Sequence, residues 1–442
     1  MKIRETSVLG LTWPIFIELF LQLLVGNVDQ IMVGRTDPNG VGAISNANQI
    51  TALLLIVFSV ICTAAMILVA QYLGAGDTRR VGRTCAAALL SNFAFGVVVS
   101  LILLLFCGPV FRAMGVAAEI FDRACLYIRI IGLGMPLQAV FLTYTAFFRS
   151  SQLMKETMLI SVLVNCLNIV GNALLIGGSF GLPALGVAGA AISSDLSRLA
   201  GVAVIGLLYR RRFGKVLTAA NLRPFPREQL RRLLSLGLPT GGESVSYNLS
   251  QICIQTVTNR FPLFVVNTRA YAVMFANVTY LFSSAIGQAT QVVAARLMGA
   301  GRVPETNRRV LTTTLWSLLA STTMSVLLWL LARPLYGLFT HDTRILELCS
   351  VIMLIEIPLE MGRAVNIVMV RCLQAVGDIA YPTVLCVIFA WLFGVGGAWL
   401  FGVYLDMGLP GIWISMALDE CVRAVLLFWR WMSGRWKSKH II

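Results

Sequence analysis

The feature that most constrains this chain is a proline followed four residues later by a glutamate inside a long apolar stretch, which occurs twice. Pro14 precedes Glu18, and 225 residues further on Pro239 precedes Glu243. A proline within an apolar helix removes a backbone hydrogen bond, and a carboxylate beside it is costly in hydrocarbon, so neither is expected to recur by drift. The repetition indicates a duplicated membrane protein whose halves use the same device.

The composition also indicates a membrane protein. With 58% hydrophobic residues, 12% charged residues and a mean hydropathy of +0.82, the 442-residue chain carries more apolar surface than a soluble domain buries. Residues 1–6 are short and charged, and the apolar stretch after them is too long for a cleaved signal. We expect that stretch to be the first membrane-spanning helix.

Runs of about 20 apolar residues between charged or Gly/Pro-rich breaks predict an all-α protein with twelve transmembrane helices. A long polar connection, residues 210–232, is expected to be a cytoplasmic linker between an N-lobe (residues 1–209) and a C-lobe (residues 233–442) of six helices each. The predicted spans are 6–34, 42–73, 85–111, 124–148, 157–176, 185–209, 233–261, 270–297, 310–332, 345–372, 383–405 and 411–431.

The distribution of Lys and Arg predicts the orientation. With a cytoplasmic N-terminus, the inside segments hold 24 of these residues and the outside segments hold 7, which is the bias typical of cytoplasmic loops. We therefore expect a multi-pass protein of a bacterial-type plasma membrane with both termini cytoplasmic. Topology and anionic lipid also explain the net charge of +15, so we expect contact with membrane lipid and no nucleic-acid partner.

The duplication extends well beyond its first signature. At the offset of 225 residues a Gly-Ala-Gly turn recurs (residues 74–76 and 299–301), and later the offset becomes 222, as in Gly186 and Gly408. Because each unit has six helices, both units begin on the same side of the membrane, which makes the halves parallel repeats. Substrate is then expected between them, near the middle of the bilayer.

Polar residues of the N-terminal half gather on two helix faces. Glu18 and Asp29 are eleven residues apart and share one face of the first helix, with Gln22 between them. Asn168 and Asn172 share a face of the fifth helix, where amides can hold a carboxylate's proton or coordinate a cation. The alternatives are that an acid pairs with a neighbouring Arg and that the amides only link helices.

The sixth helix adds Ser194 to the polar residues of the N-lobe. Asp195 follows it, one turn before Arg198, and we expect these two to form a local salt bridge. In the second half, Ile254 stands at the position equivalent to Asp29. The second half is therefore not a chemical copy of the first.

The tenth helix supplies acids of its own. Glu356 and Glu360 lie four residues apart on one face and flank Pro358. Two such carboxylates would share a proton or a cation rather than both stay charged and bare. The alternative is that Arg363, one turn further on, neutralises them.

Several motifs indicate what the chain does not do. It has no Walker motif and no HExxH, and its two His lie in or near polar ends. We therefore expect no enzyme, no catalytic residues and no cofactor. The movement of a solute driven by an ion gradient remains.

A set of motifs, in order and over essentially the whole chain, resembles the multidrug and toxic compound extrusion (MATE) family. They are Pro14 followed fifteen residues later by Asp29, VAQYLGAGD (residues 69–77), FFRSSQLMKET (residues 147–157), LGVAGAAISS (residues 185–194), and Arg371 with Gln374. This resemblance implies two six-helix bundles that form a V-shaped cleft, and the efflux of amphipathic organic compounds in exchange for H⁺ or Na⁺. We expect a monomer and cationic substrates.

The resemblance also implies an ion-coupling or substrate site in the N-lobe. Asp29 matches the first-helix acid of the family, and Asn168 and Asn172 match its fifth-helix polar residues. The family's best-described proton site has Asp where this chain has Asn172. Our hypothesis is that an organic cation and a proton compete for the charge of Asp29. The full set that we predict for this site is Asp29, Glu18, Gln22, Asn168, Asn172 and Ser194.

In the C-lobe, the resemblance aligns Glu360 and Glu356 with tenth-helix positions that carry Asp and Tyr in sodium-coupled members. The seventh-helix Glu of those members falls at Tyr247, about one turn past Glu243. A second hypothesis therefore places Na⁺ at Glu243, Glu356 and Glu360, with Tyr247 in the same site.

Four prolines are predicted to be bending points, namely Pro14, Pro136, Pro239 and Pro358. The alternative function is a flippase for a lipid-linked saccharide or another lipid, since a related superfamily also uses two bundles. Such a protein is expected to have more cationic residues in its cleft, to hold pyrophosphate, whereas intramembrane Arg are few in this chain.

Overall fold

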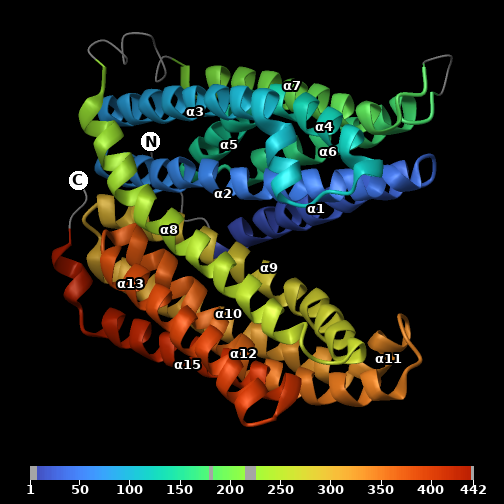
Figure 1. The fold of residues 1–442 in the computed structure, drawn as a ribbon. Coiled ribbons are helices and arrows are strands. Elements are labelled where there is room, and N and C mark those ends of the chain that lie inside the picture. The colour runs from blue at the N-terminus through green and yellow to red at the C-terminus, as the bar shows by residue number, and fades with distance from the viewer. Residues whose placement is uncertain (1–6, 179–182, 215–224, 440–442) are drawn as a thin grey trace. The chain divides into compact units, whose positions relative to one another are not determined.

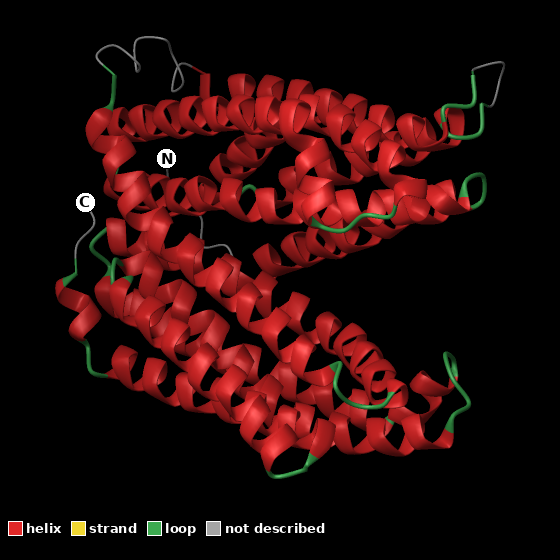
Figure 2. Ribbon diagram, in the orientation of Figure 1, coloured by secondary structure: helices red, strands yellow, loops and turns green. Residues whose placement is uncertain are grey.

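The computed structural model describes residues 7–178, 183–214 and 225–439, apart from the side chains of residues 25–27 and 38. These residues form helices and the turns that connect them (Figure 2). The helices, labelled in Figure 1 where there is room, are α1 (Val8–Gly34), α2 (Pro38–Ala75), α3 (Thr78–Ala113), α4 (Ala118–Leu133), α5 (Met135–Ser150), α6 (Met154–Leu175), α7 (Gly186–Phe213), α8 (Arg227–Thr258), α9 (Leu263–Gly299), α10 (Val303–Leu330), α11 (Ala332–Gly337), α12 (Thr343–Val376), α13 (Ala380–Phe389), η4 (Ala390–Gly396), α14 (Gly397–Trp399), η5 (Leu400–Tyr404), α15 (Gly408–Met432) and η6 (Arg435–Ser438).

The predicted all-α class is confirmed, and each of the twelve predicted spans falls on a helical segment. The fourth span is the pair α4 and α5, bent by 49°, and the eleventh runs from α13 through two π-helical turns to η5. Among the described residues, eight helices are long and apolar enough to cross a membrane, and nine when the bent pair is one span. Helices α12 and α15 fall short because they carry buried charged residues.

Several helices extend beyond the predicted spans. Helix α3 begins at Thr78 and α8 begins at Arg227, six or more residues before the predicted starts, and α7 continues to Phe213. Arg, Gln and Glu are good helix formers, so a helix continues past the apolar segment that the hydropathy pattern detects. Both ends of the predicted linker are therefore helical, and its middle, residues 215–224, lies outside the described residues.

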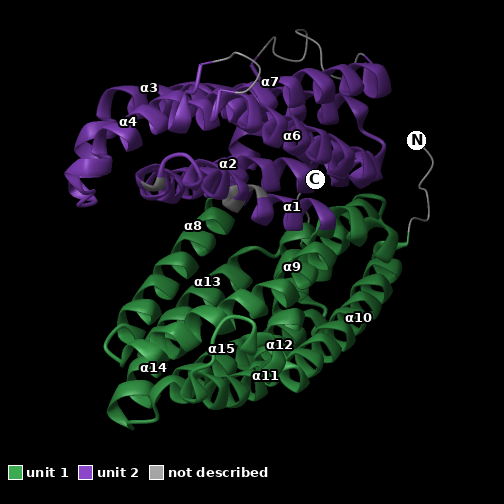
Figure 3. Cartoon of the chain, turned by 90° about the vertical axis from the view of Figure 1, so that its right-hand side faces the viewer, with its two compact units in different colours: residues 1–16, 238–442 green, residues 17–237 purple. Residues whose placement is uncertain are grey.

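The chain divides into two compact units (Figure 3). Unit 2 is Ile17–Gly237, and unit 1 combines Met1–Phe16 with Leu238–Ile442. The first part of α1 thus groups with the C-terminal helices, and α8 changes unit between Gly237 and Leu238. Both changes occur close to the duplicated prolines, Pro14 and Pro239.

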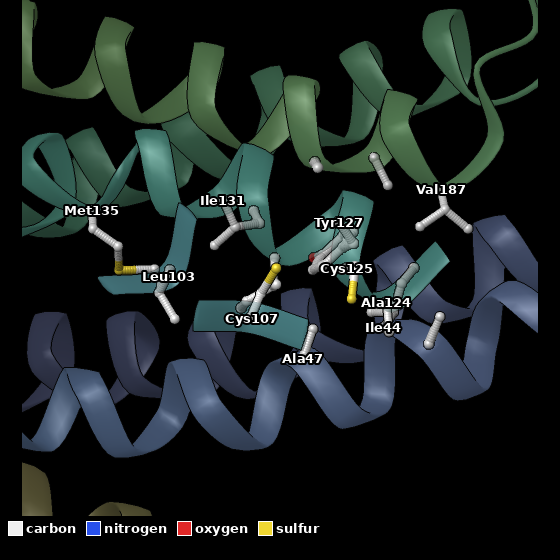
Figure 4. Close-up of a cluster of buried hydrophobic side chains, with 14 of the residues drawn as sticks. Ile44, Ala47, Leu103, Cys107, Ala124, Cys125, Tyr127, Ile131, Met135 and Val187 are labelled. Atoms are coloured by element: carbon white, nitrogen blue, oxygen red, sulfur yellow. The ribbon is translucent and has the colours of Figure 1, made fainter. Parts of the chain in front are cut away.

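Each unit has an apolar core of its own. In unit 2, side chains from α2, α3, α4 and α7 pack together, among them Ile44, Leu103, Ile131 and Val187 (Figure 4). In unit 1, α9, α11, α12 and α15 contribute to a second core that includes the buried ring of Trp413. These cores hold the helices that carry the polar residues of interest.

Two pairs of glycines show that the duplication is structural as well as sequential. Gly186 and Gly408 begin α7 and α15 with φ of +52° and +61°, a region that favours glycine. A Cβ at either Gly189 or Gly411 would lie 2.5 Å from a backbone carbonyl oxygen of the preceding span. In both halves the helix therefore packs there through bare backbone.

A serine one turn further along each of these helices repeats the pattern. Ser193 donates a hydrogen bond to the carbonyl oxygen of Asn168 at 2.8 Å, and Ser415 donates one to the carbonyl oxygen of Phe393. The two halves share this packing scaffold, so the chemical differences between them reside in a few other side chains.

Candidate functional site

Asp29 of α1 lies in a buried polar cluster in unit 2. Its side chain is 6% exposed, and it accepts hydrogen bonds from Nδ2 of Asn172 at 2.5 Å and from Oγ of Ser194 at 3.4 Å. Asn168 donates a hydrogen bond to Oγ of Ser194 at 3.0 Å. The structure thus brings together four of the predicted N-lobe residues, from helices α1, α6 and α7.

The amide of Asn172 can serve either charge state of Asp29. Its NH₂ group donates to the carboxylate, whereas its Oδ1 has no hydrogen-bond partner among the described residues. The nitrogen and oxygen of an amide exchange places by rotation about one bond. After such a rotation Oδ1 would accept a hydrogen bond from a protonated Asp29, so the site is able to satisfy the acid with and without its proton.

A salt bridge between Asp195 and Arg198 lies beside this cluster. The two side chains are 3.2 Å apart, which confirms the predicted pair, and the Arg198 guanidinium contributes a positive potential at Asp29. The Asp195 carboxylate also fills the space that a Cβ at Gly134 would need, at the bend between α4 and α5. With both acids ionised, this group has one negative charge in excess.

Glu18 and Gln22 lie outside the Asp29 cluster. Glu18 is 1% exposed and forms an ion pair with Arg149 of α5 at 2.8 Å. The hydroxyls of Thr157 and Ser161 on α6 donate to it at 3.4 and 3.2 Å. This geometry favours the alternative of a structural ion pair that joins three helices. Gln22 is exposed, so the predicted polar stripe is not continuous.

A larger charged network joins α12 and α15 in unit 1. It contains four carboxyl and two guanidinium groups, all at most 9% exposed: Glu356, Glu360, Asp419, Glu420, Arg363 and Arg423. Arg363 contacts Glu360 and lies 3.6 Å from both Glu356 and Glu420. Arg423 lies 2.5 Å from Asp419 and 3.2 Å from Glu420.

The charges of this network do not balance when every acid is ionised. Four carboxylates and two guanidiniums leave two negative charges in excess, and a buried excess of this kind is costly. One oxygen each of Glu356, Glu360 and Asp419 has no hydrogen-bond partner within the described ranges. Two protons, or bound cations of equal charge, would neutralise the network.

Polar neighbours hold the network in place. Trp413 Nε1 donates to Glu356 at 2.6 Å, and Asn366 Nδ2 donates to Glu420 at 2.6 Å. Sequence reasoning missed Asp419 and Glu420, although two acids three and four residues before Arg423 in the last apolar span were a usable signal. An acid so close to an Arg looks like a local pair, which hides its contact with another helix.

The residues predicted to hold Na⁺ are not gathered as one metal site. Arg363 pairs with both Glu356 and Glu360, as in the alternative of neutralisation, whereas Glu243 on α8 accepts a hydrogen bond from Gln374 at 3.3 Å. Within residues 7–178, 183–214 and 225–439, no group of three or more Asp, Glu, His or Cys side chains is arranged to hold a metal ion. Tyr247, one turn past Glu243, is half-buried.

The four prolines occupy two kinds of position. Pro14, Pro239 and Pro358 lie inside α1, α8 and α12. Pro136 lies in the first turn of α5, directly after the 49° bend. A proline lacks the N–H that an interior turn needs but not the first turn, so the bend coincides with its preferred place.

Comparison with known proteins shows a family. The MatE family model matches residues 14–174 and 239–400, so the two matches begin at the two duplicated prolines. The Bacillus subtilis transporter YisQ is 32% identical over 436 residues, which are 99% of this chain and 96% of that protein. The probable multidrug resistance protein NorM of Thermotoga maritima is 24% identical and covers 100% of this chain and 95% of its own length.

Solved structures show the same fold. A MOP superfamily transporter from Pyrococcus furiosus has a TM-score of 0.85 at 20% identity and covers 98% of this chain and 96% of its own. A point mutant of the Vibrio cholerae MATE transporter VcmN has a TM-score of 0.89 at 16% identity, with coverage of 98% and 97%. At these identities the likeness concerns the fold alone.

Proposed function

Because this chain belongs to the MatE family of multi-pass membrane transporters, we propose that it is a secondary active antiporter that exports organic, amphipathic cations. Export is driven by the inward flow of an ion and proceeds by alternating access. Relatives named as multidrug resistance proteins support this class of cargo. The observation that carries the proposal is the buried Asp29 cluster, where one acid meets amide and hydroxyl partners from two other helices.

Coupling follows from competition at Asp29. A proton and an organic cation both neutralise the same carboxylate, so the arrival of one favours the release of the other. Asn172 keeps the acid hydrogen-bonded in either state, and Arg198 limits the local excess to one negative charge. Exchange of one proton for one monovalent cation is the simplest stoichiometry at this site.

We favour H⁺ over Na⁺ as the coupling ion. Na⁺ prefers several oxygen ligands, and two of the three acids predicted to bind it are already paired with Arg363. A guanidinium in that position acts as a built-in cation. The network of α12 and α15 is still able to take up protons, since its acids outnumber its arginines.

The duplicated prolines are the proposed bending points of the transport cycle. Pro14 and Pro239 lie within three residues of the positions where α1 and α8 change from one compact unit to the other. A helix is weakest at a proline, so a change of angle there costs the least. Pro136 and Pro358 are proposed to serve α5 and α12 in the same way.

Transport by reconstituted vesicles tests this proposal. Uptake of ethidium, a fluorescent organic cation, is measured with a proton gradient and a Na⁺ gradient imposed separately. We expect the proton gradient to drive uptake, Asp29→Asn to abolish both uptake and ethidium-induced proton release, and the exposed control Asp122→Asn to retain both. Wild-type activity of Asp29→Asn would refute the role of this acid.

The same assay separates the two coupling ions. Uptake driven by Na⁺ at fixed pH, and lost in Glu360→Gln, would show that the C-terminal network binds Na⁺ and that our preference for H⁺ is wrong. A lipid flippase, in contrast, would move a labelled lipid-linked saccharide without any response to ethidium. The acidic excess of both clusters favours a cationic cargo over pyrophosphate.

A further inference from the structure

A cavity of about 660 Å³ lies in unit 1 between the start of α1 and the first turns of α10. Three of its lining residues are arginines, Arg302, Arg308 and Arg309, and one is an acid, Glu305. Glu305 forms an ion pair with Arg302. Among the described residues no acid lies within ion-pair distance of Arg308 or Arg309, so the cavity wall has a formal charge of +2.

The wall of this cavity continues into an exposed apolar stripe on α10. Trp316 lines the cavity and is 54% exposed, and Leu315 and Leu319 are 55% and 50% exposed. At 100° per residue, Arg308, Leu315 and Leu319 lie within about 40° of one another on the helix. Exposed leucines on a transmembrane helix face lipid tails, so charge and apolar surface follow each other along one face.

We propose that this cavity binds the phosphodiester headgroup of an anionic phospholipid. Arg308 and Arg309 offer planar guanidinium groups that hydrogen-bond to phosphate oxygens, and their charge attracts an anionic membrane surface. Trp316, about 12 Å further along the helix, is suited to the boundary between headgroups and tails. The acyl chains lie along Leu315 and Leu319.

The lipid would also contact α1. Ser7, Val8 and Leu9 form the opposite wall of the cavity, so a bound headgroup fills the space between the first turn of α1 and α10. With the predicted cytoplasmic N-terminus, this lipid belongs to the inner leaflet. Lipid binding here does not depend on what the protein transports.

Native mass spectrometry of the full-length protein in detergent tests the proposal, with phosphatidylglycerol and phosphatidylcholine titrated separately. We expect tighter binding of phosphatidylglycerol, and about thirtyfold weaker binding by Arg308→Gln/Arg309→Gln, because each cationic side chain near an anionic surface contributes roughly fivefold. The control Arg435→Gln/Lys437→Gln removes two charges at the same predicted side of the membrane, away from the cavity, and is expected to bind as wild type does.

A second variant separates the cavity from general attraction to charge. Thr312→Trp fills the cavity and keeps both arginines, and we expect it to weaken phosphatidylglycerol binding as well. Unchanged binding by both this variant and the folded double Gln variant would overturn the proposal. Inorganic phosphate that binds as tightly as the lipid, and displaces it, would overturn the lipid as the ligand and identify soluble phosphate instead.

Discussion

Replacement of Arg363 by Met is expected to destabilise unit 1 strongly. Arg363 pairs with Glu356, Glu360 and Glu420, and without it four buried carboxyls face a single guanidinium, that of Arg423. Loss of one partner from a buried ion network typically costs about 3 to 5 kcal/mol. In a unit of roughly 200 residues this corresponds to a fall of about 6 to 20 °C in the apparent melting temperature.

Matched variants make this prediction specific. Arg363→Met/Glu360→Gln removes one charge of each sign and is expected to recover most of the loss, whereas Arg333→Met, at an exposed arginine, is expected to have no effect. The assay is thermal unfolding in detergent followed by size-exclusion chromatography, at pH 6 and pH 8.

The pH dependence has a definite sign. The missing guanidinium leaves negative charge behind, and protonation of the acids removes that charge, so Arg363→Met should lose less stability at pH 6 than at pH 8. Wild-type stability of Arg363→Met at both pH values would refute the argument. Equal instability of the single and the double variant would do the same, since it would show that loss of packing, and not loss of charge balance, causes the effect.

Three further predictions concern unit 2. Gly189→Ala, where a Cβ meets backbone, is expected to lose about 1 to 3 kcal/mol in thermal unfolding, whereas Gly206→Ala in the same helix, with open space around it, is expected to be neutral. Glu18→Gln should destabilise the protein by a similar amount and leave the choice between H⁺ and Na⁺ in vesicle transport unchanged. Asn172→Leu should slow ethidium efflux about tenfold or more because Leu cannot hydrogen-bond Asp29, and Asn172→Asp should retain efflux.

The sequence predicted the spans well because the thickness of a bilayer leaves little freedom in helix length. It could not predict the helix ends, since charged residues such as those at the start of α8 continue a helix into water. The structure brings Asp29 and Asn172 together, and helix periodicity could only say that each lies on a polar face. Periodicity fixes the direction of a face but not how far neighbouring helices cover it, which is why Gln22 is exposed between two buried acids.

The network of α12 and α15 shows a different limit. Glu356 and Glu360 were visible as an acidic pair, and Arg363 as their neutralising partner. The contact between Asn366 and Glu420, 54 residues apart, depends on how two helices pack. No local pattern encodes that packing, so the sequence alone could not show that the acids of two helices form one charged group.

The shared glycine scaffold has a consequence for mutational tolerance. If the profile from saturation mutagenesis were laid over itself with a shift of 222 residues, the two copies should agree at Gly189 and Gly411, where the same backbone contact recurs. They should disagree at Asp29, whose counterpart is Ile254. The chain therefore contains its own reference: each half predicts which substitutions the other tolerates for reasons of packing, and the remaining differences identify the positions that selection holds for transport.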